Sequence, residues 1–114
     1  MGGPSTSIHN HAADAFARRI REQYGDAIES VFLFGSAARG EERGSDSDVD
    51  LLVVLYDTVE KAVVEDRIRA LAYDIELEYG VILSVLVTSP AECKQYRMES
   101  FFQQISTDAQ RLYG

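Results

Sequence analysis

The sequence contains few of the residues that small domains use for covalent or metal stabilisation. There is one cysteine, Cys93, among 114 residues, together with two prolines and no tryptophan. A single cysteine forms no intramolecular disulfide and no cysteine-based zinc site, so both kinds of cross-link are excluded. A chain that folds without disulfides suits a reducing compartment, and we therefore expect a cytoplasmic protein.

Long hydrophobic runs are also missing. The longest apolar stretch, residues 51–56, is far shorter than the roughly 20 residues that a membrane-spanning helix requires. The first residues show no basic head followed by an apolar run, so no export signal is visible. With 46% hydrophobic and 26% charged residues, the composition is that of an ordinary globular protein. We expect residues 1–7 to form a flexible segment and residues 8–114 to form one domain.

Positive charge is the third scarce property. Eleven Lys and Arg residues stand against nineteen Asp and Glu residues, which gives a formal net charge of −8. Such a surface repels the phosphate backbone of nucleic acids, so a nucleic-acid ligand or acceptor is disfavoured. A small phosphate ligand whose charge is neutralised or bridged by a metal ion is still compatible with this balance.

Hydrophobic periodicity predicts a small α/β sandwich. Apolar positions three and four residues apart indicate helices, whereas β-branched and aromatic runs indicate strands. The predicted helices cover residues 8–24, 59–79 and 90–105, and the predicted strands cover 30–34, 49–56 and 81–88, with a short strand or turn around 112–113. Gly25 and Gly80 are expected to end the first two helices. The pattern indicates three main helices on a sheet of three or four strands and leaves the strand directions open.

The loop between the first two predicted strands carries the unusual residues. Gly35 and Ser36 follow an apolar strand directly, and they offer exposed backbone N–H groups and a hydroxyl. If a helical turn starts here, its N-terminus is a phosphate-binding cradle. This loop is therefore a candidate site for a phosphate group.

Two carboxylates follow at the end of the same loop. Asp48 and Asp50 flank Val49 at the start of the second strand, so both side chains point to the same face of the sheet. Neighbouring carboxylates repel unless a cation lies between them, and Mg²⁺ binds in this way through one or two carboxylates plus substrate phosphates. If the two strands are neighbours, the phosphate cradle and the cation site lie at the same end, as metal-assisted phosphoryl transfer requires.

At these residues the sequence resembles the minimal nucleotidyltransferases of the DNA polymerase β superfamily. Their signature is an apolar residue, Gly-Ser, about ten to thirteen residues, and then Asp-apolar-Asp. Here Phe34 precedes Gly35-Ser36, and eleven residues separate this pair from Asp48-Val49-Asp50. The longer form of the signature is matched by Arg39-Gly40 and by Ser47 before the carboxylates. The resemblance extends over about residues 8–105.

The resemblance implies a nucleotidyltransferase-type α/β sandwich with a mixed sheet. It implies Mg²⁺ or Mn²⁺ as cofactor and a nucleoside triphosphate, in the first place ATP, as substrate. Asp48 and Asp50 are then the catalytic and metal-binding residues, while Gly35, Ser36, Arg39 and Ser47 contact the nucleotide. Arg39 has a second interpretation, in which it neutralises neighbouring acids of the loop. Family members of this size resemble the antitoxin of HEPN/MNT toxin–antitoxin pairs, so a HEPN-type protein is the implied partner.

One position departs from the family pattern. The family places a third carboxylate on the strand after the following helix, and the polar residue on that strand here is Ser84. Glu76, Glu78 or Asp46 could compensate for the missing charge. The resemblance thus implies Mg²⁺-dependent transfer of a nucleoside monophosphate, AMP from ATP, to a hydroxyl on a protein or small molecule. The alternative is a catalytically weakened binding module that neutralises its partner by docking.

Two other patterns have simpler interpretations. Residues 46–50 imitate the opening of a calcium-binding loop, with Asp57 at its twelfth position, but Leu51 stands where that loop needs glycine. We therefore expect a strand there and no calcium loop. His9 and His11 have no ligand spacing and no acid cluster beside them, and we expect both to face solvent near the N-terminus.

Overall fold

The computed structural model describes residues 8–35, 48–57, 60–95, 97–106 and 109–113. The predicted flexible segment 1–7 lies outside these residues. The elements along the chain are α1 (Ile8–Tyr24), β1 (Ile28–Phe34), β2 (Asp48–Leu55), α3 (Lys61–Tyr79), β3 (Ile82–Thr88), α4 (Pro90–Gln95), α5 (Glu99–Ser106) and β4 (Gln110–Tyr113). Within these ranges no helix is long and apolar enough to cross a membrane.

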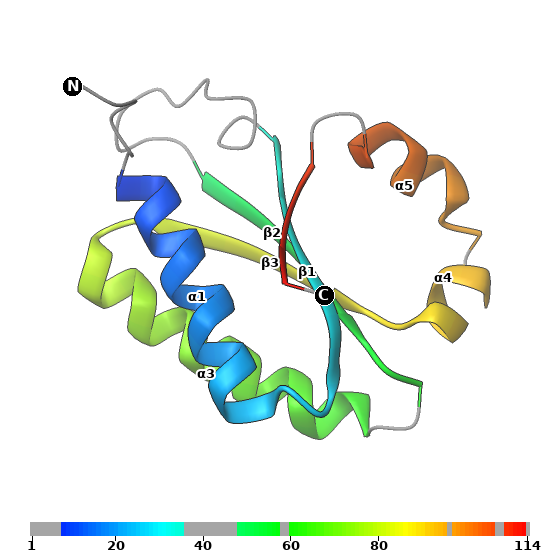
Figure 1. The fold of residues 1–114 in the computed structure, drawn as a ribbon, viewed down its shortest axis with the longest axis horizontal. Coiled ribbons are helices and arrows are strands. Elements are labelled where there is room, and N and C mark those ends of the chain that lie inside the picture. Colours follow the sequence, from blue (N-terminus) through cyan, green and yellow to red (C-terminus); the bar gives the residue numbers. More distant parts are fainter. Residues whose placement is uncertain (1–7, 36–47, 58–59, 96, 107–108, 114) are drawn as a thin grey trace.

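The four strands form one mixed sheet in the order β3-β2-β1-β4. β1 pairs antiparallel with both β2 and β4, whereas β2 and β3 run parallel. α3 is the crossover between these two parallel strands. Figure 1 shows α1 and α3 side by side on one face of the sheet, with α4 and α5 on the other. The predicted α/β sandwich with a mixed sheet is confirmed, and the strand directions that the pattern left open are now known.

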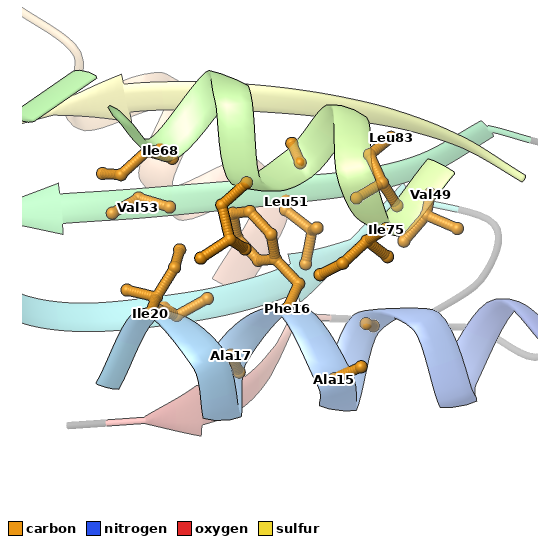
Figure 2. Packing of buried hydrophobic residues seen from close by; sticks show 14 of the residues in the cluster. Ala15, Phe16, Ala17, Ile20, Val49, Leu51, Val53, Ile68, Ile75 and Leu83 are labelled. Atoms are coloured by element: carbon orange, nitrogen blue, oxygen red, sulfur yellow. The ribbon is translucent and has the colours of Figure 1, made fainter. Parts of the chain in front are cut away.

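The hydrophobic core lies between the sheet and the α1–α3 layer. Alternate residues of β2 point into it, and Figure 2 shows them facing Phe16 and Ile75. Because strand side chains alternate between faces, the intervening residues of β2 point to the opposite face. The apolar stripes predicted for α1 and α3 supply the helical side of the core; their buried members are Ala13, Phe16, Ala17, Ile20, Ile68, Leu71 and Ile75.

The predicted helix ends agree with the structure at two glycines. α1 ends at Tyr24, immediately before Gly25, and α3 ends at Tyr79. Gly80 adopts the left-handed conformation (φ 69°), and its N–H donates to the carbonyl of Glu76 at 2.8 Å. This conformation carries little cost for glycine, which explains why the helix ends there.

The single helix predicted for residues 90–105 is wrong, because the structure has two helices there. The start is as expected: the Ser89 hydroxyl accepts a hydrogen bond from the backbone N–H of Glu92 at 3.3 Å. α4 then ends where Arg97 takes a left-handed conformation (φ 51°), and the N–H of Met98 donates to the carbonyl of Cys93 at 2.9 Å. This closure is a Schellman motif with arginine in place of glycine, so no residue type marked it in the sequence.

The expectation that His9 faces solvent is also wrong. Its side chain is only 3% exposed, whereas His11 is exposed as expected. His9 lies one turn before Ala12 and Ala13, on the face of α1 that packs on the core. Its Nε2 atom has no hydrogen-bond partner within the described part of the chain.

Charged side chains of α3 are paired with one another and with β3. Glu65 accepts hydrogen bonds from Lys61 at 2.9 Å and from Arg69 at 2.6 Å. Arg69 also donates to the carbonyl of Val85 on β3 at 3.1 Å. The hydrogen bond from Lys61 is the main cause that lowers the pKa of Glu65, and burial partly opposes it. Glu65 is therefore held between two basic side chains of the same helix.

We expect Glu65→Gln to weaken the pH dependence of stability. Because the pKa of Glu65 is lower in the folded than in the unfolded chain, its contribution is present above about pH 4.3 and is lost as the pH falls through the folded-state pKa. Because the Lys61–Glu65 pair is partly exposed, the free energies of unfolding of the parent and the variant at pH 7 should differ by less than about 1 kcal/mol. Urea unfolding at pH 7 and pH 3 measures it, with Glu22→Gln as the control. An equal loss of stability in both variants would contradict the assignment.

Candidate active site

The two halves of the predicted site lie at the same end of neighbouring strands. β1 ends at Phe34 and β2 begins at Asp48, and their antiparallel pairing places Phe34 directly opposite Asp50. Gly35 follows Phe34, so it stands beside the first residues of β2. A shared phosphate and cation site requires β1 and β2 to be neighbours, and in the structure they are.

Asp48 and Asp50 lie on the sheet face opposite the core. Val49 between them is fully buried in the α1–α3 layer, so the two carboxylates point to the other side. Asp48 is exposed and Asp50 is half-buried. On this face, Phe34 packs edge-to-face on Phe101 of α5, with 6.0 Å between the ring centroids. The carboxylate pair therefore lies at the open end of a face that α5 partly covers.

Gly35 makes room for the Asp50 carboxylate. The glycine has φ +76°, a conformation that residues with a side chain rarely adopt. A Cβ atom built on it would overlap Asp50 Oδ2 and would lie 3.1 Å from the carboxyl carbon. The sequence suggested Gly35 only as a source of backbone N–H groups. The structure adds a second reason for glycine, namely the close approach of a carboxylate to its Cα.

Ser84 lies next to the carboxylate pair on β3. The parallel pairing of β2 and β3 sets Ser84 opposite Asp50, and the Ser84 hydroxyl donates a hydrogen bond to Asp48 Oδ2 at 3.3 Å. In the described residues, no group of three or more His, Cys, Asp or Glu side chains could hold a metal ion. The described donor set thus consists of two carboxylates and one hydroxyl. No spacing in the sequence indicated the contact between Ser84 and Asp48.

The two described candidates for replacing a third carboxylate, Glu76 and Glu78, are paired elsewhere. The Glu76 carboxylate accepts a hydrogen bond from the backbone N–H of Leu83 at 2.8 Å, at the edge of β3. Glu78 pairs with Arg19 of α1 at 2.7 Å, on the layer that covers the opposite face of the sheet. Asp46, the third candidate, lies outside the described residues.

The remaining candidate residues either lie outside the described residues or are far from Asp48 and Asp50. Ser36, Arg39 and Ser47 fall in the undescribed range 36–47. Asp57 lies beyond the opposite end of β2, where its carboxylate accepts a hydrogen bond from the backbone N–H of Ala91 at 2.9 Å. Because Asp48 begins an eight-residue strand and Asp57 lies beyond its other end, the two cannot belong to one calcium loop.

Comparison with known proteins places the chain in a family. The profile of the family described as "Nucleotidyltransferase domain" matches residues 13–107. Two relatives come from Methanocaldococcus jannaschii. The protein named "Putative protein adenylyltransferase MJ1305" is 36% identical over 87 residues, which are 73% of this chain and 56% of that protein. The one named "Putative protein adenylyltransferase MJ0604" is 28% identical over 102 residues, which are 90% and 95% of the two chains. The chain thus spans about half the length of the first relative and nearly all of the second.

Solved structures show the same fold. A crystal structure of a toxin–antitoxin with AMP-PNP superposes with a TM-score of 0.60 at 18% identity, covering 89% of this chain and 73% of that one. A mutant of the toxin–antitoxin MntA–HpeT superposes with the same TM-score at 16% identity and with the same coverage. Together with the family match over most of the chain, these findings show that this protein belongs to the nucleotidyltransferase domain family, within the polymerase β-like superfamily that its Gly-Ser and Asp-Val-Asp signature indicated.

Proposed function

We propose that this protein is a Mg²⁺-dependent nucleotidyltransferase that transfers AMP from ATP to a hydroxyl group. The observation that carries the proposal is the convergence at one sheet end of Gly35, Asp50 and Asp48. Membership of the family supports a nucleoside triphosphate as the substrate. ATP in particular is supported by the names of the two relatives, both of which specify adenylyl transfer.

The carboxylate pair suits a divalent cation. Its donors are carboxylate oxygens, which are the hard ligands that Mg²⁺ and Mn²⁺ prefer. The space above the Gly35 Cα, which a Cβ would fill, is occupied by the Asp50 carboxylate. We propose that Asp48 and Asp50 hold the cation, and that Gly35, Ser36, Arg39 and Ser47 contact the nucleotide. When bound, the cation neutralises negative charge on the triphosphate.

The remaining chemistry is positioning. The acceptor oxygen attacks the α-phosphorus and forms a new O–P bond. The bond between the α-phosphorus and the oxygen that bridges to the β-phosphate breaks, pyrophosphate leaves, and the acceptor proton passes to water. In such reactions most of the acceleration comes from alignment and from preorganised charge. The role of this chain is to hold the phosphates where β1 ends and β2 begins, beside Asp48 and Asp50, which the sheet keeps in position.

We propose a protein as the acceptor. The net charge of −8 disfavours a nucleic acid, and both relatives are named as protein adenylyltransferases. Two structural neighbours are toxin–antitoxin structures, which supports an antitoxin role for this chain. We propose that the partner is a HEPN-type toxin and that both proteins act in the cytoplasm. The acceptor hydroxyl would then lie on the partner itself.

A second candidate function rests on Ser84. Because the position opposite Asp50 on β3 carries a hydroxyl and not a carboxylate, the chain could be a binding module that neutralises a partner by docking alone. The intact pair of Asp48 and Asp50 favours the enzyme. The two candidates differ in whether a covalent product forms.

Transfer of a labelled nucleotide tests both candidates. The purified protein is incubated with Mg²⁺, ATP labelled at the α-phosphate and the protein encoded by the neighbouring gene. We expect label and a mass increase of one AMP on the partner, with neither when the variant Asp48→Ala/Asp50→Ala is used. If no label is transferred and the double variant still neutralises the partner, the binding module is correct and the enzyme is not.

A further inference from the structure

We infer that Ser84 is a positioning residue that holds the Asp48 carboxylate in place for cation binding. The inference rests on the proposed function, because it concerns the same cation site. It goes beyond that proposal by giving the hydroxyl of Ser84 a task of its own. The family pattern has a carboxylate at this position; in this chain Ser84 stands there, and its hydroxyl donates a hydrogen bond to the Asp48 carboxylate.

The sheet register places this hydroxyl where it can act. β2 and β3 run parallel with Asp48 opposite Ile82 and Asp50 opposite Ser84, so all four side chains share one face. Ser84 is therefore diagonal to Asp48, and its Oγ atom reaches Asp48 Oδ2 at 3.3 Å. Both strands are held in a four-stranded sheet, so the distance between their Cα atoms is set by backbone pairing.

Among the exposed residues on this side of β3, Ser84 is the polar one; Thr88, at the end of the strand, is polar but buried. The neighbours of Ser84 on the same face are Ile82 and Leu86, which are 54% and 38% exposed. Ser84 is exposed as well, so solvent exposure alone does not distinguish it from Ile82 and Leu86. What distinguishes it is the contact of its hydroxyl with Asp48.

The hydrogen bond from Ser84 opposes the repulsion between the Asp48 and Asp50 carboxylates. Asp48 is the first residue of β2 and is exposed, and its carboxylate would turn away from Asp50 because like charges repel. Within the described part of the chain, the Ser84 hydroxyl donates a hydrogen bond to this carboxylate. A carboxylate has about four acceptor sites, so one bond to Oδ2 leaves the others for a cation. A neutral donor therefore orients Asp48 without competing for the cation.

Binding of Mn²⁺ in the absence of nucleotide tests this role. We expect Ser84→Ala to weaken Mn²⁺ binding about tenfold, the lower end of the range for groups that orient metal ligands. Ser84→Thr keeps the hydroxyl and should stay within about threefold of the parent protein, on the same reasoning. Thr88→Val, which removes a hydroxyl from the same strand about 13 Å further along, is the matched control and should bind as the parent does. Calorimetry and the electron paramagnetic resonance signal of free Mn²⁺ give the affinities, and thermal unfolding verifies that each variant folds.

The outcomes separate this inference from the proposed function. If the parent and Ser84→Ala bind Mn²⁺ equally, and Asp50→Asn does not bind, the inference is overturned while the cation site stands. If Ser84→Ala and Ser84→Thr are weakened alike, the side chain acts through packing and the inference is again overturned. If the parent protein shows no Mn²⁺ binding that depends on Asp50, both proposals fail together.

Discussion

Asn in place of Asp50 should reduce AMP transfer about 100- to 1000-fold and leave the fold intact, since preorganised charge at such a site is worth two to three orders of magnitude per group. Asp50 is central to the site: it faces Phe34 on one side and Ser84 on the other, and its carboxylate packs against Gly35. Asparagine has nearly the same shape, so it preserves the contact with Gly35 but carries no charge for the cation. The measurement is the rate of AMP transfer under saturating ATP and Mg²⁺.

Measuring the free energy of unfolding of Asp50→Asn distinguishes a loss of cation binding from a loss of folding. The free energy of unfolding should be unchanged or should rise by up to about 1 kcal/mol, because the repulsion between Asp48 and Asp50 disappears. Asp57→Asn is the control, since Asp57 follows the other end of the same strand and its oxygen accepts a hydrogen bond from Ala91 that asparagine can also accept. A transfer rate within tenfold of the parent for Asp50→Asn would exclude Asp50 from the cation site.

Gly35→Ala is expected to displace the Asp50 carboxylate and to abolish measurable cation binding. The added Cβ would overlap Asp50 Oδ2, and the backbone is held at φ +76°, so neither side can yield without cost. The left-handed conformation alone costs alanine about 1 kcal/mol relative to glycine. The clash adds to this cost at the position where the carboxylate must stay if it is to bind a cation. Mn²⁺ titration and urea unfolding measure the two consequences separately.

Gly80→Ala is a closely matched control for this prediction. Gly80 also has a positive φ, at +69°, but a Cβ built on it has no neighbour within 4 Å. Gly80→Ala should therefore lose about 1 kcal/mol of stability from the backbone alone and should bind Mn²⁺ as the parent does. The difference between the two variants isolates the contact between Gly35 and Asp50. If both variants keep full cation affinity, that contact has no part in the site.

Much of the fold could be predicted because local patterns and tertiary packing agree. The stripe containing Phe16 and Ile20 is buried as its spacing predicted, and Gly80 ends α3 because the left-handed conformation suits glycine. The two wrong predictions, at Arg97 and His9, arose where residue type disagrees with conformation or burial. Arg97 adopts a helix-ending conformation that is typical of glycine, and His9 is buried by its place on the helix in spite of its polarity.

The candidate site, too, was predicted from the sequence only in part. The identity and alternation of Asp48 and Asp50 follow from the sequence, since strand geometry alone puts residues two apart on one face. The pairing of these carboxylates with Gly35 required β1 and β2 to be antiparallel neighbours, and apolar strands carry no information on which strand they will pair with. That Ser84 of β3 is the neighbour of Asp48 and Asp50 became known only with the register between β2 and β3.

By itself, the sequence determined the class of the domain, its main helices and strands, the family signature and the shortage of positive charge, because all of these depend on residue type and spacing along one chain. Only the tertiary structure decided the strand directions, the close approach of Asp50 to Gly35 and the hydrogen bond from Ser84 to Asp48. These contacts join residues 15 and 36 positions apart in the sequence. Their geometry is set by sheet register, which arises from the packing of the whole domain and has no local signature.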